Sequence, residues 1–212
     1  MLKRGLAFAL ALVMLASVSV AGATGMEIEK NGQWYTEVSA WAKDGVEKAI
    51  DLGVAYWPSR GDAKTSISRC YFAEDAAAVV ALAYGSDLAA YEGFRVLQLM
   101  RGTGDNQKYA YETLDILRGR GNGDMDFFGD ITRQEAAVML ARAYRIYCDE
   151  IHDDMEPLAY ADKNDIADWA KDGVALCGQL GLLVGANGTF SPTDTATRAM
   201  GAVILQRLDE AD

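Results

Sequence analysis

The feature that most constrains the fold of this chain is an internal repeat. The residues Trp41-Ala-Lys-Asp-Gly-Val46 recur unchanged as Trp169-Ala-Lys-Asp-Gly-Val174, 128 residues later. Similar tripeptides end in Arg69, Arg133 and Arg198, at spacings of 64 and 65 residues. Self-similarity at a fixed period is the signature of a repeat architecture. The chain therefore divides into three units of nearly equal length.

Each unit reads as helix, loop, helix. Apolar residues at helical spacing from Trp41 to Ile50 predict the first helix, which a glycine ends at Gly53 and, in the last unit, at Gly181. The spacing places Trp41 and Trp169 on the apolar faces of their helices, and we expect both in the core.

The second helix of the middle unit carries the clearest local signal. Thr132-Arg-Gln-Glu135 is a capping box, which predicts a helix from Arg133 to about Tyr147. The other second helices are expected to begin near Ser68 and Thr197, and an additional helix is expected over residues 87–100. Since no run of alternating polarity is long enough for a strand, the expected fold class is all-α.

The first 23 residues resemble an export signal. Lys3 and Arg4 precede an apolar stretch that ends at the cleavage pattern Ala21-Gly22-Ala23. The stretch is shorter than the roughly 20 residues of a spanning helix, so cleavage is favoured over an uncleaved anchor. We expect a secreted protein with no later transmembrane segment.

The charge balance bears on the partners. The chain has 20 Lys and Arg against 31 Asp and Glu, a net charge of −11. This argues against nucleic acid or an anionic membrane as the main partner.

The sequence shows little catalytic or metal-binding chemistry. His152 is the single histidine, and its pairing with Cys148 supplies too few ligands for zinc. Cys70, Cys148 and Cys177 are too few and too widely spaced for a disulfide framework, and Cys177 is expected in the core. We therefore expect no enzyme, no cofactor and no resident metal. A glycosidase using two carboxylates is an open alternative.

Calcium is a second alternative. The segment from Asp124 to Glu135 has acidic residues at positions one, three and twelve of a calcium loop and Gly129 at position six. Phe128 occupies position five, where an oxygen ligand belongs. A capped helix after a turn-rich loop explains the same residues.

The three units resemble the S-layer homology domain family, in which three tandem copies anchor proteins to bacterial cell walls. The motifs of the third unit are Tyr160-Ala-Asp162, Trp169-Ala170, the run from Gly185 to Pro192, and Thr197-Arg-Ala-Met200. The expected boundaries are 24–92, 93–152 and 153–212. Only the middle unit keeps the motif glutamate, Glu135; Tyr71 and Met200 replace it elsewhere.

The resemblance implies a pseudo-threefold arrangement whose inter-unit grooves hold a secondary cell-wall polysaccharide, often anionic and pyruvylated. The candidate ligand-binding residues are Arg69, Arg133, Arg198 and Glu135, with Trp57 as a stacking platform. An arginine in the first turn of a helix adds a bidentate donor to a helix end that already favours anions. We therefore expect a non-catalytic protein of the cell wall or S-layer. The alternative is a degenerate module that binds protein without glycan.

Overall fold

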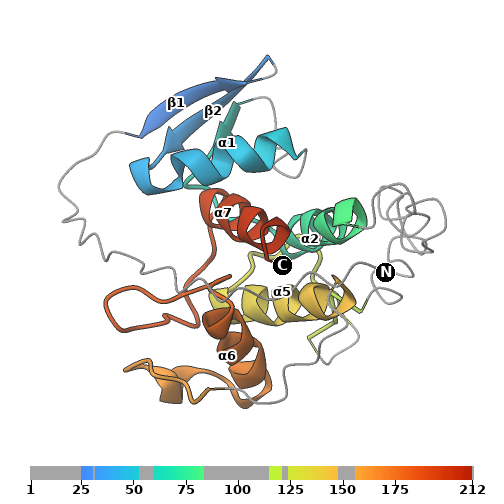
Figure 1. Cartoon of the computed structure of the whole chain (residues 1–212), viewed down its shortest axis with the longest axis vertical. Helices are drawn as coiled ribbons and strands as arrows, with labels where there is room; N and C mark the ends of the chain where they lie inside the picture. Colours follow the sequence, from blue (N-terminus) through green and yellow to red (C-terminus); the bar gives the residue numbers. More distant parts are fainter. Residues whose placement is uncertain are drawn as a thin grey trace, which may run out of the picture.

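The structure is a computed structural model that describes residues 25–30, 32–52, 60–83, 115–120, 124–147 and 156–211. The expected signal, Trp57, the expected helix over 87–100, Cys148 and His152 lie outside the described residues. The described elements are the strands β1 (Met26–Lys30), β2 (Gln33–Val38) and β3 (Arg60–Asp62) and the helices α1 (Lys43–Asp51), α2 (Arg69–Ala83), α5 (Arg133–Tyr147), α6 (Lys171–Gln179) and α7 (Arg198–Asp209) (Figure 1). None of these helices has the length and apolar character needed to cross a membrane.

The two copies of the six-residue block fold alike. Each begins in a 3₁₀ turn, Ala40–Ala42 or Asp168–Ala170, that leads directly into α1 or α6. Gly181 follows α6 with a φ of 70°, which confirms it as a left-handed glycine at the helix end. The repeated letters therefore encode a repeated local structure.

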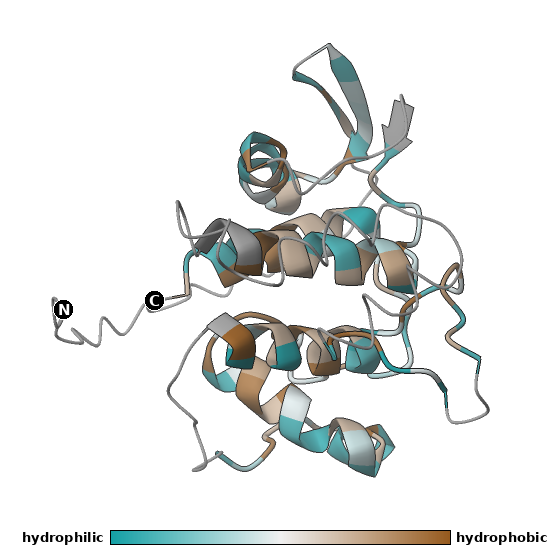
Figure 2. Cartoon of the chain, turned by 90° about the vertical axis from the view of Figure 1, so that its right-hand side faces the viewer, coloured by the Kyte–Doolittle hydropathy of each residue, from teal (hydrophilic) through white to brown (hydrophobic). Residues whose placement is uncertain are grey.

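About half of the described residues are helical, and they also include strands, so the expected all-α class is confirmed only in part. A three-stranded sheet with the order β1-β2-β3 lies in the first unit, where β1 and β2 are antiparallel and β2 and β3 parallel. Figure 2 shows these strands above the stacked helices. Tyr35 and Val38 are both buried although they are three residues apart, and Glu37 between them has a φ of 58°. This irregularity breaks the period of two by which a strand is recognised in sequence.

The two helices that follow the repeated block pack on different partners. α6 lies against α5, and α1 lies against α7 near the other end of the described chain (Figure 1). Both contacts are made at a glycine of the repeated block, because Gly173 faces Val138 and Gly45 faces Val203. Without a Cβ, each glycine lets the two helix backbones approach closely.

The segments before α2, α5 and α7 hydrogen-bond to one another in a closed cycle. The amide of Ile67 donates to the carbonyl of Ala196 at 3.0 Å, Ala196 donates to Ile131 at 2.9 Å, and Ile131 donates back to Ile67 at 3.1 Å. All three residues are buried. Because a buried amide without a partner is costly, each segment depends on the other two.

The first amides of these helices are also bound across units. The amide of Arg69 donates to Gly129, that of Arg133 to Asp194 and that of Arg198 to Thr65, at 2.8–3.0 Å. The next amide in each helix likewise donates to a loop carbonyl. We expected helix ends that are open to anions. This is wrong for the first two amides of α2, α5 and α7, because they already donate to carbonyl groups of neighbouring loops.

The capping box before α5 is confirmed. The Thr132 amide donates to Glu135 Oε2 at 2.9 Å, and the Glu135 amide points to Thr132 Oγ1 at 3.4 Å. Thr197 caps α7 in a similar way, because its hydroxyl accepts from the Met200 amide at 3.3 Å. Reciprocal caps of this kind fix where a helix starts.

Thr132→Ala is expected to lower the free energy of unfolding by about 1 kcal/mol, because the amide of Glu135 loses its acceptor. Chemical denaturation measures the change. Thr132→Ser keeps the hydroxyl and serves as the matched control. An unchanged midpoint for Thr132→Ala would show that the hydroxyl does not stabilise the helix start.

Candidate functional site

Arg69 is buried where the first two units meet. Its side chain is 4% exposed and forms an ion pair with Glu135, whose side chain is 13% exposed. Its other terminal nitrogen donates to the carbonyl of Arg118 at 2.8 Å. Burial lowers the pKa of Arg69, and the charge of Glu135 opposes that change. The structure thus brings Arg69 and Glu135 together, as a clamp between α2 and α5.

Glu135 is the centre of this network. Besides Arg69, it accepts from the amide and the hydroxyl of Thr132, each at 2.9 Å, and pairs with Arg120 at 3.2 Å. Arg120 also pairs with Asp126 at 3.0 Å. A carboxylate held by this many donors is fixed in one orientation. Glu135 therefore joins the helix cap to the inter-unit clamp.

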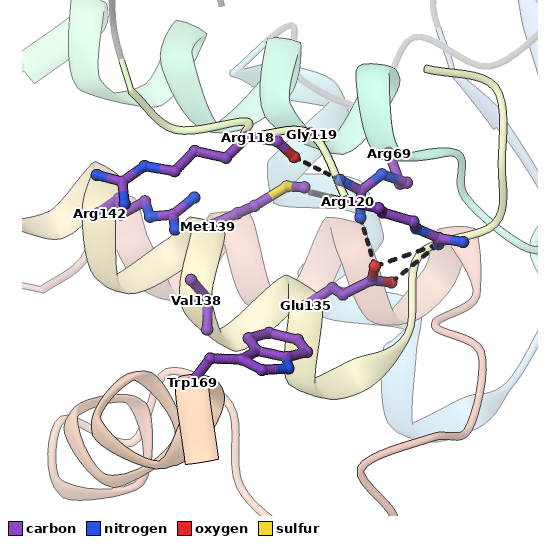
Figure 3. Close-up of a pocket in the computed structure, with 9 residues that line it drawn as sticks. All are labelled: Arg69, Arg118, Gly119, Arg120, Glu135, Val138, Met139, Arg142 and Trp169. Atoms are coloured by element: carbon purple, nitrogen blue, oxygen red, sulfur yellow. Dashed lines mark hydrogen bonds and ion pairs between the residues drawn. The ribbon is translucent and has the colours of Figure 1, made fainter. Parts of the chain in front are cut away.

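The clamp forms one end of a cavity of about 550 Å³. Figure 3 shows Arg69, Arg120 and Glu135 at one end, and Arg118 with Arg142 at the other. The cavity is lined by Arg69, Arg118, Gly119, Arg120, Glu135, Val138, Met139, Arg142 and Trp169. The lining includes four arginines and one carboxylate, and because Asp115 and Asp126 pair with Arg118 and Arg120 at its edge, positive charge exceeds negative charge by only one.

Trp169 forms the facing wall of the cavity. We expected it in the core, but its exposed fraction is 59%, and that of Trp41 in the first copy is 56%. Trp169 is exposed because Ala170, Gly173 and Val174 occupy the buried positions of the repeated block. Trp169 itself lies in the 3₁₀ turn before α6. Trp169 therefore presents an exposed indole to the cavity.

Arg142 is a cavity residue that the sequence analysis missed. It donates to the carbonyl of Ile116 at 3.1 Å, and Arg207 makes the matching contact to Leu182 at 3.3 Å. Both arginines lie nine residues after a motif arginine, a spacing that could have singled them out. The first unit has Ala78 at this position.

Arg133 and Arg198 lie at the starts of other helices, away from the Arg69 clamp. Arg133 donates to the carbonyls of Phe190 and Val184 at 2.8 and 3.0 Å, and its guanidinium lies 5.0 Å from the centre of the Phe190 ring. For the side chain of Arg198 the described residues provide no hydrogen bond or ion pair. The three motif arginines therefore have three different environments.

The loop from Gly185 to Pro192 is tied to the start of the third unit. Asp162 accepts from the amides of Phe190 and Ser191 at 2.8 and 2.7 Å, and the rings of Tyr160 and Phe190 are 5.3 Å apart. In the N-terminal part of the described chain, β2 pairs with β3, with Trp34 opposite Arg60.

The residues that suggested calcium are engaged with other groups. Glu135 and Asp126 are held by arginines, and the described residues include no group of three acidic, histidine or cysteine side chains that could hold a metal. Cys70 and Cys177 are buried and form no disulfide. Burial raises the pKa of Cys177 to about 12, in keeping with the expected core position.

The comparison with known proteins identifies a segment near the C-terminal end of the described chain. Residues 159–199 match the S-layer homology domain. This segment holds the Asp162 clamp and the loop up to Pro192, and it ends in the first turn of α7. The chain carries an S-layer homology domain.

Three curated relatives share part of the sequence with this chain. An amylopullulanase of Thermoanaerobacterium thermosulfurigenes is 35% identical over 81 residues, 38% of this chain. An endoglucanase of Bacillus sp. (strain KSM-635) is 30% identical over 111 residues, 49% of the chain, and the exoglucanase XynX of Acetivibrio thermocellus is 35% identical over 96 residues, 45% of the chain. The matches span 4%, 12% and 9% of those proteins, so they do not indicate the activity of the enzymes in this chain.

The Asp162 clamp of the S-layer homology domain makes stability depend on pH. Hydrogen bonds from the amides of Phe190 and Ser191 lower the pKa of Asp162 from its ordinary value of 3.8. A carboxyl group with a lowered pKa stabilises the folded state above its unfolded pKa, and this contribution disappears as the pH falls through the folded pKa. Asp162→Asn is therefore expected to lower the melting temperature by a constant amount above about pH 5.

Below pH 3.8 the melting temperatures of wild type and Asp162→Asn should converge. Differential scanning calorimetry from about pH 2.5 to about pH 7 measures the difference in melting temperature on both sides of the Asp162 titration. Asp165→Asn, an exposed aspartate in the same segment, is the matched control. A difference that is the same at every pH would show that the charge of Asp162 is not what stabilises the loop.

Proposed function

We propose that this chain is an exported, non-catalytic protein that binds a secondary cell-wall polysaccharide through a groove between its units. The S-layer homology domain supports association with the cell surface or cell wall. The observation that carries the proposal is the cavity where Arg118, Arg120 and Arg142 face Trp169. Guanidinium groups pair with carboxylates in two-point fashion, and an exposed indole offers an apolar face to a sugar ring.

The proposal assigns distinct roles to the residues of this groove. Arg120 is about half exposed and contacts an acidic group of the glycan. Arg69 and Glu135 are positioning residues, since their mutual ion pair holds Arg120 in place. Pyruvylated sugars are the expected ligands because they combine a carboxylate with a ring.

We extend the proposal to three units, 24–92, 93–152 and 153–212, around a pseudo-threefold axis. The closed hydrogen-bond cycle through Ile67, Ile131 and Ala196 supports it, as does the packing of α1 and α6 on equivalent neighbours. In this arrangement Arg133 and Arg198 belong to the other two grooves, and Trp41 is the counterpart of Trp169. Residues 1–23 serve as the export signal.

Co-sedimentation with bacterial sacculi tests the function. The purified protein from residue 24 onward is mixed with walls before and after acid extraction of the secondary polymer. We expect pelleting that extraction abolishes. Trp169→Ala should weaken binding about tenfold, as the loss of roughly 1.4 kcal/mol of stacking requires.

Trp34→Ala is the matched control, because Trp34 is an exposed tryptophan of β2 that does not line the cavity. It should pellet like the wild type. If the wild type pellets with neither preparation, the alternative of a protein-interaction module is favoured. The loss of the motif glutamate at Tyr71 and Met200 is the feature that supports this alternative.

A further inference from the structure

A second cavity adjoins the groove on the side of α5 that lies farther from the clamp. Its volume is about 430 Å³, and it shares Arg118, Val138, Arg142 and Trp169 with the first cavity. Arg145 and Asp172 line only the second. Trp169 and Val138 thus line two neighbouring spaces, of which the first has Arg69 and Arg120 and the second has Arg145 of its own.

The second cavity has more positive than negative charge. Arg118, Arg142 and Arg145 face two carboxylates, Asp115 and Asp172, and Asp115 is already bound to Arg118 through both of its oxygens. Among the described residues, Arg142 forms no ion pair and donates only to a backbone carbonyl. Burial and the nearby charge of Arg118 lower the pKa of Arg142, and the charge of Asp115 opposes that change in part.

The arrangement of the charges suggests an extended ligand. Figure 3 shows the guanidinium groups of Arg118 and Arg142 at the opposite end of the first cavity from Arg69 and Arg120, with the apolar side chains of Met139 and Val138 between them. A ligand with one acidic group can reach one end only. A chain of sugars with repeated acidic groups can reach both, with a ring on Trp169 between them.

We infer that Arg118, Arg142 and Arg145 form a second anion subsite, so that the groove takes an anionic glycan chain through at least two consecutive acidic sugars. This inference rests on the proposed function and specifies its ligand. Two linked contacts bind far more tightly than one, because the second contact forms at a high effective concentration. The groove therefore selects polymers over single charged sugars.

Galacturonic acid and trigalacturonic acid serve as probes, since they differ in the number of carboxylates on the same sugar. Isothermal titration calorimetry with the full mature chain measures both affinities. We expect the trimer to bind the wild type about tenfold more tightly than the monomer does. Arg145→Gln should lower the affinity for the trimer about fivefold and change the affinity for the monomer less than about twofold.

Arg145 is exposed, so its replacement leaves the core intact. Lys163→Gln is the matched control, because it removes the same charge from an exposed residue that lines neither cavity. It should leave both affinities unchanged. The inference is overturned if the trimer binds no more tightly than the monomer, or if Arg145→Gln lowers the affinity for both probes equally. It is also overturned if the trimer does not bind at about 10 mM, a concentration at which even an interaction of roughly 4 kcal/mol would be seen.

The sacculus assay keeps this test separate from the proposed function. Pelleting without any advantage of the trimer would leave the wall-binding function intact and remove the second subsite. A trimer advantage that depends on Arg145, without pelleting, would support an anionic glycan site and refute binding to the wall polymer.

Discussion

Arg69→Met is expected to lower the free energy of unfolding by about 3 kcal/mol. The substitution removes one member of a buried ion pair and leaves Glu135, only 13% exposed, with less positive charge around it. It also leaves the carbonyl of Arg118 without its donor. Arg120 and Thr132 still hold Glu135, which places the expected cost at the lower end of the range for broken buried pairs.

A double-mutant cycle tests this explanation. Glu135→Gln removes the charge but keeps a side chain that can complete the capping box. The double variant Arg69→Met, Glu135→Gln should be at least about 1 kcal/mol more stable than the two single losses added together predict. Strict additivity in urea denaturation would show that Arg69 stabilises the fold through packing alone.

Gly45→Ala is expected to destabilise the protein by about 2 kcal/mol, although alanine normally favours a helix by about 1 kcal/mol over glycine. A Cβ on Gly45 would lie 2.7 Å from Val203 Cγ2 and 3.2 Å from Val203 Cα, where α1 crosses α7. The helices must separate or Val203 must shift, and both disturb a tightly packed interface.

The compensating change is Val203→Ala, which removes the nearer of the two clashing atoms. The double variant Gly45→Ala, Val203→Ala should be more stable than Gly45→Ala alone, and thermal unfolding measures the difference. Gly173→Ala should behave like Gly45→Ala, because its Cβ would lie 3.0 Å from the Cα of Val138. A stabilised Gly45→Ala would mean that the two helices are not held in close contact.

The local signals in the sequence predicted the local structure well. The capping box of Thr132 and Glu135, the helix starts at Arg133 and Arg198, and the left-handed Gly181 all depend on a few neighbouring residues. The sheet was missed because the irregular β2 lacks alternation and because its partner β3 is only three residues long. Pairing between distant segments leaves no local signal in such short strands.

The site was harder to predict because its side chains come from segments that are far apart in the sequence. Arg69, Arg133 and Arg198 have similar sequence contexts, but their environments depend on which other helix start lies beside each of them. Glu135 stands opposite Arg69 and binds it. Met200 and Tyr71 occupy the positions equivalent to Glu135 in the other units and carry no charge. Only the cross-unit contacts reveal which arginine is neutralised.

The closed cycle through Ile67, Ile131 and Ala196 also limits how such a protein can change in length. An open stack of repeats can gain or lose a member at its end, because the remaining contacts are unaffected. The closed cycle has no free end, so removing any one of the segments before α2, α5 and α7 would leave one buried amide and one buried carbonyl of the other two without partners. In the proposed arrangement the loss of one segment is therefore felt by both of the others.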